Sequence, residues 1–479
     1  MVKPGDLPLP TRPTAAGTTL IMGNGDCGQL GLGEDIKSRY KYAFVKAIKD
    51  QRVVHVACGG MHSLALCENG KVFSWGCNDD GALGREVPDG EECDVAEIPL
   101  LATLNVVKLA CGDSISLALT GDGLIYGWGT FKGTETSQIG FSDGVNKATS
   151  PVLMTGTVFS SNRFVDVAAG NNHALALTSQ GKVFSWGNTE HGQCGFKTHR
   201  PVSALNPRGL NFSHHKAIAV ACGGDHSLVV DVEGDVWTFG LNNNGQCGSH
   251  PSNLVLHTPV VLLKPDPKVR AVAAAGGDHF SAVLLEDGHV LTFGKAADGQ
   301  LGLGDLINLD ADQNLTAERF YVDITAPDGE ELRQEIPAHV YRAAVVPALH
   351  DIKAIAVGSN HAFAIDAHGV AWRWGFNEMG QCGTGDSAND EEATEDVTTP
   401  IPIDMSRSKS TVVAVAAGAQ HSVIVANIPN TTPDAPVPEI QVNGGVDANG
   451  VDGDASSSSD PVAAPPLPAA SQEPMDTTA

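Results

Sequence analysis

The chain has few aromatic and few basic residues for its length. Of 479 residues only 5% are aromatic, and 30 Lys and Arg stand against 56 Asp and Glu, which gives a formal net charge of −26. Such a surface repels nucleic acids and anionic membranes at a distance, so any nucleic-acid contact has to be local. The length suits one large all-β domain or two to three ordinary domains.

Several sequence signatures of chemistry are also missing. The ten cysteines show no C-x-x-C spacing, so we expect free thiols in a reducing compartment, without disulfides or bound zinc. The motifs G-x-x-x-x-G-K-[ST], H-E-x-x-H and G-x-S-x-G are absent, which disfavours hydrolytic enzymes. No apolar run approaches the ~18 residues that span a bilayer, and residues 1–17 lack a signal-peptide core. We therefore expect a soluble intracellular protein.

What the sequence does contain is an internal repeat with a period near 50 residues. A phrase close to V-x-V-A-C-G-G-x-H-S-x-A-L-x-x-x-G-x-V-x-S-W-G-x-N-x-x-G-x-x-G recurs along the chain. Its short alternating segments, separated by Gly, Asn and Asp, predict several strands per unit. The glycine that ends the third strand occurs seven times, at Gly23, Gly76, Gly129, Gly187, Gly240, Gly294 and Gly375. The sequence therefore predicts an all-β fold, a seven-bladed β-propeller.

The two ends of the repeat region complement each other. Residues 18–31 carry only the second half of a unit and residues 412–425 only the first half. A blade shared between them would close the ring and remove exposed sheet edges. We expect a disordered extension at 1–17, the propeller at 18–427 and a disordered acidic tail, rich in Pro, Ala and Ser, at 428–479.

Three insertions depart from the repeat, at residues 196–215, 303–349 and 384–410. We expect them on the surface, and the sequence assigns no role to the last two.

The recurring histidines and tryptophans are interpreted as structural. One histidine per unit at one repeat position is typical of an imidazole that hydrogen-bonds backbone beside a turn, so we expect no metal ion. The tryptophans precede the strand-ending glycine and are interpreted as packing residues. The histidines are His62, His173, His226, His279, His361 and His421, with Ile115 in place of a seventh; the tryptophans are Trp75, Trp128, Trp186 and Trp374.

The third unit breaks the symmetry twice. In the other six units the closing glycine lies eight positions after the strand-ending glycine, whereas Gly140 lies eleven positions after Gly129. The added residues predict a polar hairpin that projects beyond the rim, with Phe131 near its start. Asp113 is interpreted as the one acid at its place in the loop that precedes the repeat histidine. The alternative interpretation is that the sequence of one unit has drifted without acquiring a function. A protruding hairpin beside a lone carboxylate favours instead a surface that binds a partner protein.

These features resemble the regulator of chromosome condensation family over residues 18–426. Beyond the repeat itself, residues 76–85, 110–114 and 128–132 resemble the family's exchange factor for the small GTPase Ran. The resemblance implies guanine nucleotide exchange on Ran, in its nucleotide-free or GDP form, without bond chemistry and without a cofactor. It also implies a monomer in the nucleus, on chromatin.

The resemblance also implies which residues act. Asp113 is the main catalytic carboxylate, supported by Asn172 and His279, and Asp26 and His421 add partner contacts. The family has an aspartate at the position of Asn172, so an amide replaces a charge. The wedge that would press on the GTPase consists of Phe131, Lys132, Gly133, Thr134, Glu135, Thr136, Ser137, Gln138 and Ile139.

The resemblance also bears on contact with chromatin. Only Lys3 and Arg12 precede Gly17, and no basic cluster typical of a nuclear-import signal follows, so we do not expect a DNA-binding tail. Histone contact through scattered basic loops is an expectation without assigned residues, and no membrane contact is expected.

Two other functions stay open at this stage. One is a non-catalytic propeller scaffold of the same family, which the amide at Asn172 favours. The other is an enzyme or sugar-binding propeller that uses the central channel or the loop histidines, against which the plain repetition of those histidines counts.

Overall fold

A computed structural model describes most of the propeller region. The described residues are 6–88, 91, 93–133, 138–198, 204–250, 252–263, 269–304, 316–325, 331–385, 395–405 and 410–429, without the side chains of residues 138 and 316–338. The chain divides into the units Met1–Pro433 and Asp434–Ala479. The second unit, and with it almost all of the expected tail, lies outside the described residues, so the domain boundaries stay predictions.

Seven antiparallel sheets form the blades, and the strands of each run from the innermost to the outermost in the order that follows. Blade one is β30 (Thr411–Ala417), β31 (His421–Asn427), β1 (Thr18–Asn24) and β2 (Ser38–Phe44). Blade two is β3 (Val53–Cys58), β4 (His62–Cys67), β5 (Val72–Gly76) and β6 (Ala96–Glu97). Blade three is β7 (Val106–Cys111), β8 (Ile115–Thr120), β9 (Ile125–Gly129) and β12 (Ala148–Leu153), with a separate hairpin of β10 (Phe131–Lys132) and β11 (Gln138–Gly140).

Blades four to seven follow in chain order. Blade four is β13 (Phe164–Ala169), β14 (His173–Thr178), β15 (Val183–Gly187) and β16 (Arg208–Gly209). Blade five is β17 (Ala217–Cys222), β18 (His226–Asp231), β19 (Val236–Leu241) and β20 (Val255–Leu263). Blade six is β21 (Ala271–Gly276), β22 (Phe280–Leu285), β23 (Val290–Lys295), β25 (Glu331–Val345) and β24 (Thr316–Thr325). Blade seven is β26 (Ile352–Val357), β27 (His361–Asp366), β28 (Ala371–Gly375) and β29 (Val397–Pro402).

Helices are few in the described part of the chain. They are the α-helix α1 (Thr157–Ser161) and the 3-10 helices η1 (Lys46–Ile48) and η2 (Pro99–Thr103). None of them has the length and hydropathy that a membrane span needs. The insertion at 303–349, expected on the surface, includes the hairpin β24–β25, which adds a fifth strand to blade six.

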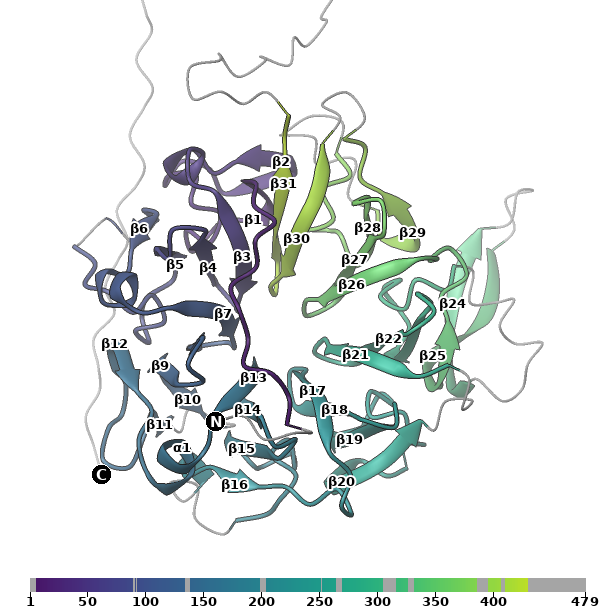
Figure 1. The fold of residues 1–479 in the computed structure, drawn as a ribbon. Coiled ribbons are helices and arrows are strands. Elements are labelled where there is room, and N and C mark those ends of the chain that lie inside the picture. Colours follow the sequence, from purple (N-terminus) through teal and green to yellow (C-terminus); the bar gives the residue numbers. More distant parts are fainter. Residues whose placement is uncertain are drawn as a thin grey trace, which may run out of the picture. The chain divides into compact units, whose positions relative to one another are not determined.

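The ring closes through the predicted shared blade. β1 pairs with β31 in continuous antiparallel register from Thr18 opposite Ala426 to Gly23 opposite His421, and Figure 1 shows the two ends of the propeller region side by side there. The innermost strand of every blade contacts the innermost strand of the next, including β30 with β3. The seven-bladed, end-closed propeller is therefore confirmed.

The pairing of residues between strands tests the repeat positions assigned from the sequence. Each strand-ending glycine lies opposite the first residue of the second strand, as Gly76 does to His62. Its φ is positive (+105° at Gly76), and a Cβ there would overlap the carbonyl oxygen of Met61, so glycine is required. Gly294, however, lies opposite Phe280 and not His279. The placement of His279 on the repeat position was wrong, because spacing along the sequence missed one residue before β22.

The repeat histidines join neighbouring blades through serine hydroxyls. Ser116 Oγ donates to the carbonyl of Ala82 (3.0 Å), so it accepts from the imidazole Nε2–H of His62. The Nε2 to Oγ pairs are His62 with Ser116 (2.9 Å), His173 with Ser227 (2.8 Å), His226 with Ser281 (2.7 Å), His361 with Ser422 (2.7 Å) and His421 with Ser63 (2.8 Å). The role is structural as expected, but the partner is a hydroxyl and not backbone. We call these five contacts the polar seams.

The two remaining seams are apolar on both sides. In blade three the repeat position holds Ile115, and the serine position of blade four holds Ala174. In blade six it holds Phe280, and blade seven has Ala362. At both seams the histidine and its serine are thus absent together, and a histidine alone would be a buried imidazole without its hydroxyl partner.

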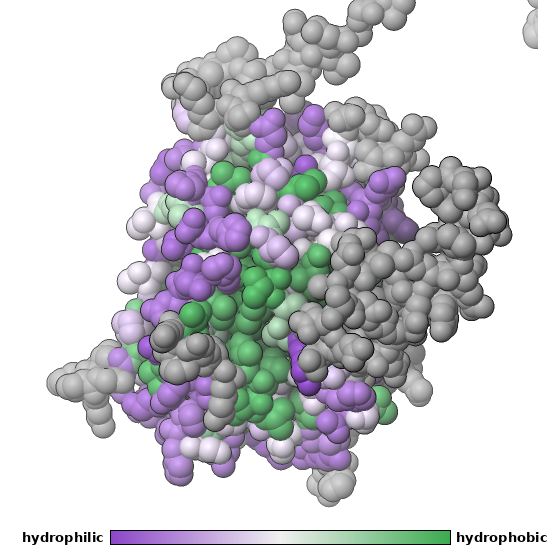
Figure 2. All heavy atoms as spheres, turned by 90° about the vertical axis from the view of Figure 1, so that its right-hand side faces the viewer, coloured by the Kyte–Doolittle hydropathy of each residue, from purple (hydrophilic) through white to green (hydrophobic). Residues whose placement is uncertain are grey.

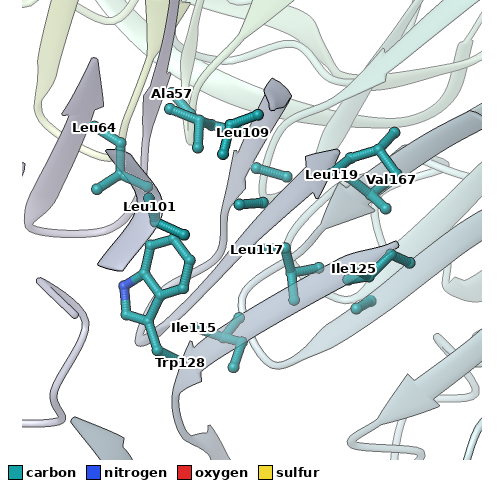
Figure 3. Packing of buried hydrophobic residues seen from close by; sticks show 14 of the residues in the cluster. Ala57, Leu64, Leu101, Leu109, Ile115, Leu117, Leu119, Ile125, Trp128 and Val167 are labelled. Atoms are coloured by element: carbon teal, nitrogen blue, oxygen red, sulfur yellow. The ribbon is translucent and has the colours of Figure 1, made fainter. Parts of the chain in front are cut away.

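The core lies between neighbouring blades, and Figure 3 shows it between blades two, three and four. Trp128 lies among Leu101, Ile115 and Leu117, fully buried, and its Nε1–H donates to the carbonyl oxygen of Ala82 (2.7 Å) in the preceding blade. All four repeat tryptophans are 0% exposed, which confirms them as packing residues.

The described part of the N-terminal extension is packed on the propeller. The backbone N–H of Leu7 donates to Ser179 O (2.7 Å), and the guanidinium of Arg12 donates to carbonyl oxygens of Val106 and Glu68. Ala16 is 6% exposed. For residues 6–17 the expectation of disorder was wrong, because these contacts satisfy backbone and guanidinium groups of the segment.

The outer strands of the blades carry apolar surface. Figure 2 shows a band of hydrophobic side chains on the side of the molecule that lies to the right in Figure 1. Exposed apolar residues of outer strands include Val260 in β20, Val345 in β25 and Ile401 in β29, and also Val152 and Leu153 in β12 of blade three. This surface is separate from the loops at the strand ends, where the predicted site residues lie.

Candidate functional site

The loops that enter the second strand of each blade meet around the propeller axis. In each of them one backbone N–H donates to a carbonyl of the next blade's loop, at 2.9 to 3.3 Å, and the seven bonds form a closed circle. We call the donating residues the axial ring: Gly60, Asp113, Asn171, Gly224, Asp278, Ser359 and Ala419. The prediction that Asp113 is the only acid at its place was therefore wrong. Asp278 is the second acid, hidden by the same one-residue error that misplaced His279.

Asp113 lies half-buried on this ring, at the centre of the predicted site. A Cβ on Gly60 would overlap Asp113 Oδ1, so a larger residue there would require the carboxylate to shift. Burial raises the pKa of Asp113, and the charges of Asp80 and Asp278 raise it further, while Lys132 works against them. The carboxylates of Asp80 and Asp278 thus place further negative charge around Asp113.

Asp80 of blade two connects Asp113's loop to the hairpin. Its Oδ2 accepts the hydroxyl of Ser114 (2.9 Å) and forms an ion pair with the Nζ of Lys132 (2.5 Å). Burial raises the pKa of Asp80, but these hydrogen bonds bring it below its ordinary value. Burial lowers the pKa of Lys132, but Asp80 and Asp113 bring it above its ordinary value. Both directions are those of a formed ion pair.

The predicted wedge is a hairpin, but its first residue is an anchor. β10 pairs with β11, Phe131 opposite Gly140. Phe131 is 0% exposed and packs against Gly187 of blade four, so it does not project, because its ring fills the core between blades three and four. Lys132, Gly133 and Ile139 are half-buried. The tip residues Thr134, Glu135, Thr136 and Ser137, and the side chain of Gln138, lie outside the described residues.

Two asparagines of blade four hold the base of the hairpin. Asn172 Oδ1 accepts the backbone N–H of Lys132 (2.8 Å), and Asn188 Nδ2 donates to its carbonyl oxygen (3.3 Å). The amide at position 172 thus provides the acceptor that a carboxylate would provide, without the charge.

The other predicted residues are spread over the same face. Asp26 is exposed in blade one, where its Oδ2 accepts from Asn24 Nδ2 (3.0 Å). His279 is half-buried beside Asp278, and its carbonyl accepts from Lys295 N–H (2.8 Å). His421 is 0% exposed and bonded to Ser63, so its prediction as a partner contact was wrong, because it belongs to a polar seam. The structure brings together Asp113, Lys132 and Asn172.

Sequence reasoning missed Asp80, Asp278 and Asn188. Asp278 could have been found by aligning Phe280 with the repeat histidines. Asp80 and Asn188 could not, because their partner Lys132 belongs to another blade and no spacing along the chain links them.

The hairpin replaces a turn that the other blades share. Six blades have two glycines three residues apart, both with positive φ, after the strand-ending glycine: Gly28 and Gly31, Gly81 and Gly84, Gly192 and Gly195, Gly245 and Gly248, Gly299 and Gly302, Gly380 and Gly383. In three of these turns a carbonyl between the two glycines accepts the Nε1–H of the next blade's tryptophan: Gln29 accepts Trp75, Ala82 accepts Trp128 and Gln300 accepts Trp374. Blade three has the hairpin there, and the buried Nε1 of Trp186 has no hydrogen-bond partner among the described residues.

A pocket of about 250 Å³ lies beside the hairpin base. Its lining includes Ile139 of β11, Asn188 and Glu190 of blade four, and Lys197 and His257. The pocket places polar and charged groups of blades four and five next to the hairpin.

One group of described side chains could hold a metal ion, and it lies at the other end of the blades. His215 Nδ1 is 2.8 Å from Asp231 Oδ2 and 3.1 Å from Glu233 Oε2. Asp231 also accepts Trp237 Nε1 (2.8 Å) and the backbone N–H groups of Glu233 and Asp235. Hydrogen bonding and turn formation account for this group.

Comparison with known proteins gives a consistent result. The family model described as RCC1-like domain matches residues 18–424. Protein pim1 of Schizosaccharomyces pombe is 31% identical, covering 88% of this chain and 77% of its own length, and the human Regulator of chromosome condensation is 30% identical, covering 86% and 91%. Guanine nucleotide exchange factor SRM1 of Saccharomyces cerevisiae is 30% identical, covering 84% and 85%.

A solved structure agrees with these relatives. The crystal structure of Prp20p from Saccharomyces cerevisiae, studied for its binding to Gsp1p and histones, superposes with a TM-score of 0.74 at 29% identity, covering 88% of this chain and 93% of that one. Fold, repeat and sequence all agree, and the chain belongs to the RCC1-like domain family of the regulators of chromosome condensation.

Proposed function

We propose that this protein is a guanine nucleotide exchange factor for the small GTPase Ran and that blade three and its neighbours form the exchange site. The observation that carries the proposal is the convergence of a hairpin found in one blade, the axial carboxylate of Asp113 and the blade-four amide of Asn172 on one face. Membership in a family that includes named exchange factors supports it.

The proposed mechanism is competition for the GTPase's phosphate-binding loop. A GTPase that binds its nucleotide with nanomolar or tighter affinity gains ~12 kcal/mol or more, largely through phosphate, Mg²⁺ and backbone donors. The hairpin would press beside that loop, and Asp113 would engage a cationic side chain released from the phosphates. Since burial and two neighbouring carboxylates raise the pKa of Asp113, an added cation there is favoured. The nucleotide-free form is stabilised and nucleotide leaves faster, with no bond made or broken.

The other proposed partners follow from relatives. Prp20p was studied for its binding to histones as well as to Gsp1p, so we propose histone contact and a nuclear, chromatin-bound location for this chain too. We also propose that it acts as a monomer, because the ring closes within one chain.

The test follows release of fluorescent GDP from purified Ran with wild type, Asp113→Ala and Asp287→Ala. Asp287 lies in the turn after β22, at the end of that strand remote from the axial ring. Wild type and Asp287→Ala should accelerate release, and Asp113→Ala should lose at least about 30-fold, the ~2 kcal/mol of a central contact residue. Equal rates for Asp113→Ala and wild type would contradict the assigned role.

The second candidate is a scaffold of the same family without exchange activity, favoured by the uncharged Asn172. Pull-down with nucleotide-free Ran separates the two: the exchange factor should bind it tightly and lose it on addition of GDP, and the scaffold should not bind it.

A further inference from the structure

We propose that Asp80 is a positioning residue for the exchange site: through Lys132 it fixes the base of the blade-three hairpin against the axial loop. This role deepens the function proposed above and rests on it for its consequences in exchange. It does not rest on that function for the geometry, which can be tested without Ran.

Lys132 is the residue at which three blades meet. Its ammonium pairs with Asp80 of blade two at 2.5 Å, and its backbone N–H and C=O bond to Asn172 and Asn188 of blade four. The preceding Phe131 is fully buried. Backbone and ring contacts therefore fix the hairpin on the blade-four side, and the ion pair with Asp80 fixes it on the blade-two side.

Asp80 is itself held in place, which a positioning residue requires. Its Oδ2 also accepts the hydroxyl of Ser114, and Ser114 is 5% exposed and follows Asp113 in the chain. The side chain of Asp80 is 19% exposed, while the side chain of Lys132 is 40% exposed. One end of the pair is thus fixed by the axial loop, and the other end carries the hairpin.

The pair also sets the charge around Asp113. The charged groups that act on Asp113 are Lys132, which favours its ionised form, and Asp80 and Asp278, which oppose it; the hydroxyl of Ser114 also favours the ionised form. Removing Asp80 takes away a negative neighbour, and removing the charge of Lys132 takes away a positive one. The two changes should therefore move the ionisation of Asp113 in opposite directions, which a merely structural contact would not do.

The neighbouring Asp79 offers a matched control. It lies in the same loop and is exposed, and its carbonyl oxygen, not its carboxylate, accepts from Lys147 (2.9 Å). Asp79→Asn removes the same charge one residue away and leaves the contacts of Asp80 in place.

The first readout is hydrogen exchange of the full chain over residues 127–141, without Ran. A partly exposed ion pair is worth little, so Asp80→Asn should speed exchange at the hairpin base by about 1.5- to 5-fold. Asp80→Glu should restore protection, and Asp79→Asn should match wild type. Equal protection in Asp80→Asn and wild type would overturn the proposal.

The second readout is Ran-dependent GDP release against pH. Asp80→Asn should lower the maximal rate and move the acid limb of the profile to lower pH, whereas Lys132→Met should move it to higher pH. Faster release by Asp80→Asn would show that the pair restrains the hairpin, and the proposal would be wrong. If wild type itself does not accelerate release, the proposed function fails, and the hydrogen-exchange comparison still decides the role of Asp80.

Discussion

The seam between blades three and four keeps its axial hydrogen bond but lacks the histidine–serine contact of the polar seams and, among the described residues, an acceptor for its tryptophan. At an ordinary seam His226 bonds Ser281, and Ser281 donates to Gln246 of the preceding turn. At the third seam Ile115 and Ala174 replace histidine and serine, and Trp186 has lost its acceptor. This seam carries Asp113 and the hairpin base instead. The polar seams stabilise the ring. The seam between blades three and four lacks these polar contacts, and it lies where we propose that a partner protein binds.

The apolar seam of blades six and seven sharpens the comparison. It has the same pair of losses, at Phe280 and Ala362, and an axial acid, Asp278, on the same ring. It lacks the hairpin, because Gly299 and Gly302 form the ordinary turn there and Trp374 donates to Gln300. Among the described residues, an axial acid beside an apolar seam therefore occurs twice, and the hairpin once.

The largest expected effect comes from opening the ring at blade one. Ending the chain after Ser410 removes β30 and β31 and leaves β1 without its inner partner. We expect loss of the cooperative transition in a thermal melt followed by circular dichroism, since the ~5–15 kcal/mol of a typical domain depends on closure. Ending after Pro429 keeps β31 and should leave the melt as in wild type. A cooperative, unshifted melt of the shorter chain would refute closure as a source of stability.

The next largest effect on stability is expected from removing the histidine of a polar seam. His226 is 0% exposed, and burial lowers its pKa to about 3, so a neutral imidazole holds the seam. His226→Ala should cost about 2–4 kcal/mol of unfolding free energy in urea, from the cavity and the lost hydrogen bond. His279→Ala, one residue outside the repeat position, should cost less than about 0.5 kcal/mol. If the two variants lost similar amounts of unfolding free energy, His279 would have to occupy the repeat position between the blades, which contradicts the register described above.

The apolar seam between blades three and four can also be converted into a polar seam by substituting two residues. Ile115→His alone places an imidazole opposite Ala174 without an acceptor, which should cost about 1–3 kcal/mol. Adding Ala174→Ser supplies the hydroxyl, so a double-mutant cycle in urea should show a favourable coupling of about 1 kcal/mol. Coupling near zero would mean that seam chemistry is not transferable between blades.

The smallest expected effect concerns pH. Since the folded protein holds the proton of Asp113 more tightly than the unfolded chain does, the free energy of unfolding should fall as pH rises from the ordinary aspartate pKa to the raised one, and then level off. Asp113→Asn should abolish this decline and be the more stable protein at neutral pH, while losing exchange activity. Unfolding in urea at several pH values checks this, and a decline unchanged in Asp113→Asn would assign it to another group.

The blades and their closure could be predicted because glycine periodicity and the complementary ends are properties of the sequence alone. The site was only partly predictable. The hairpin's extra length showed in the chain, but the burial of Phe131 depends on space beside Gly187 in another blade. His421 was predicted as a contact although its repeat position already indicated a seam. The ion pair of Asp80 with Lys132 joins residues of two blades, which no periodicity reveals.

The hairpin between blades three and four is, in this proposal, what makes the propeller an exchange factor. The most direct test is the rate of fluorescent GDP release from Ran with a variant lacking Thr134 to Gln138, checked for an unchanged thermal melt. We predict that the variant keeps its fold and no longer accelerates release. Release at the wild-type rate by the folded variant would contradict the proposal.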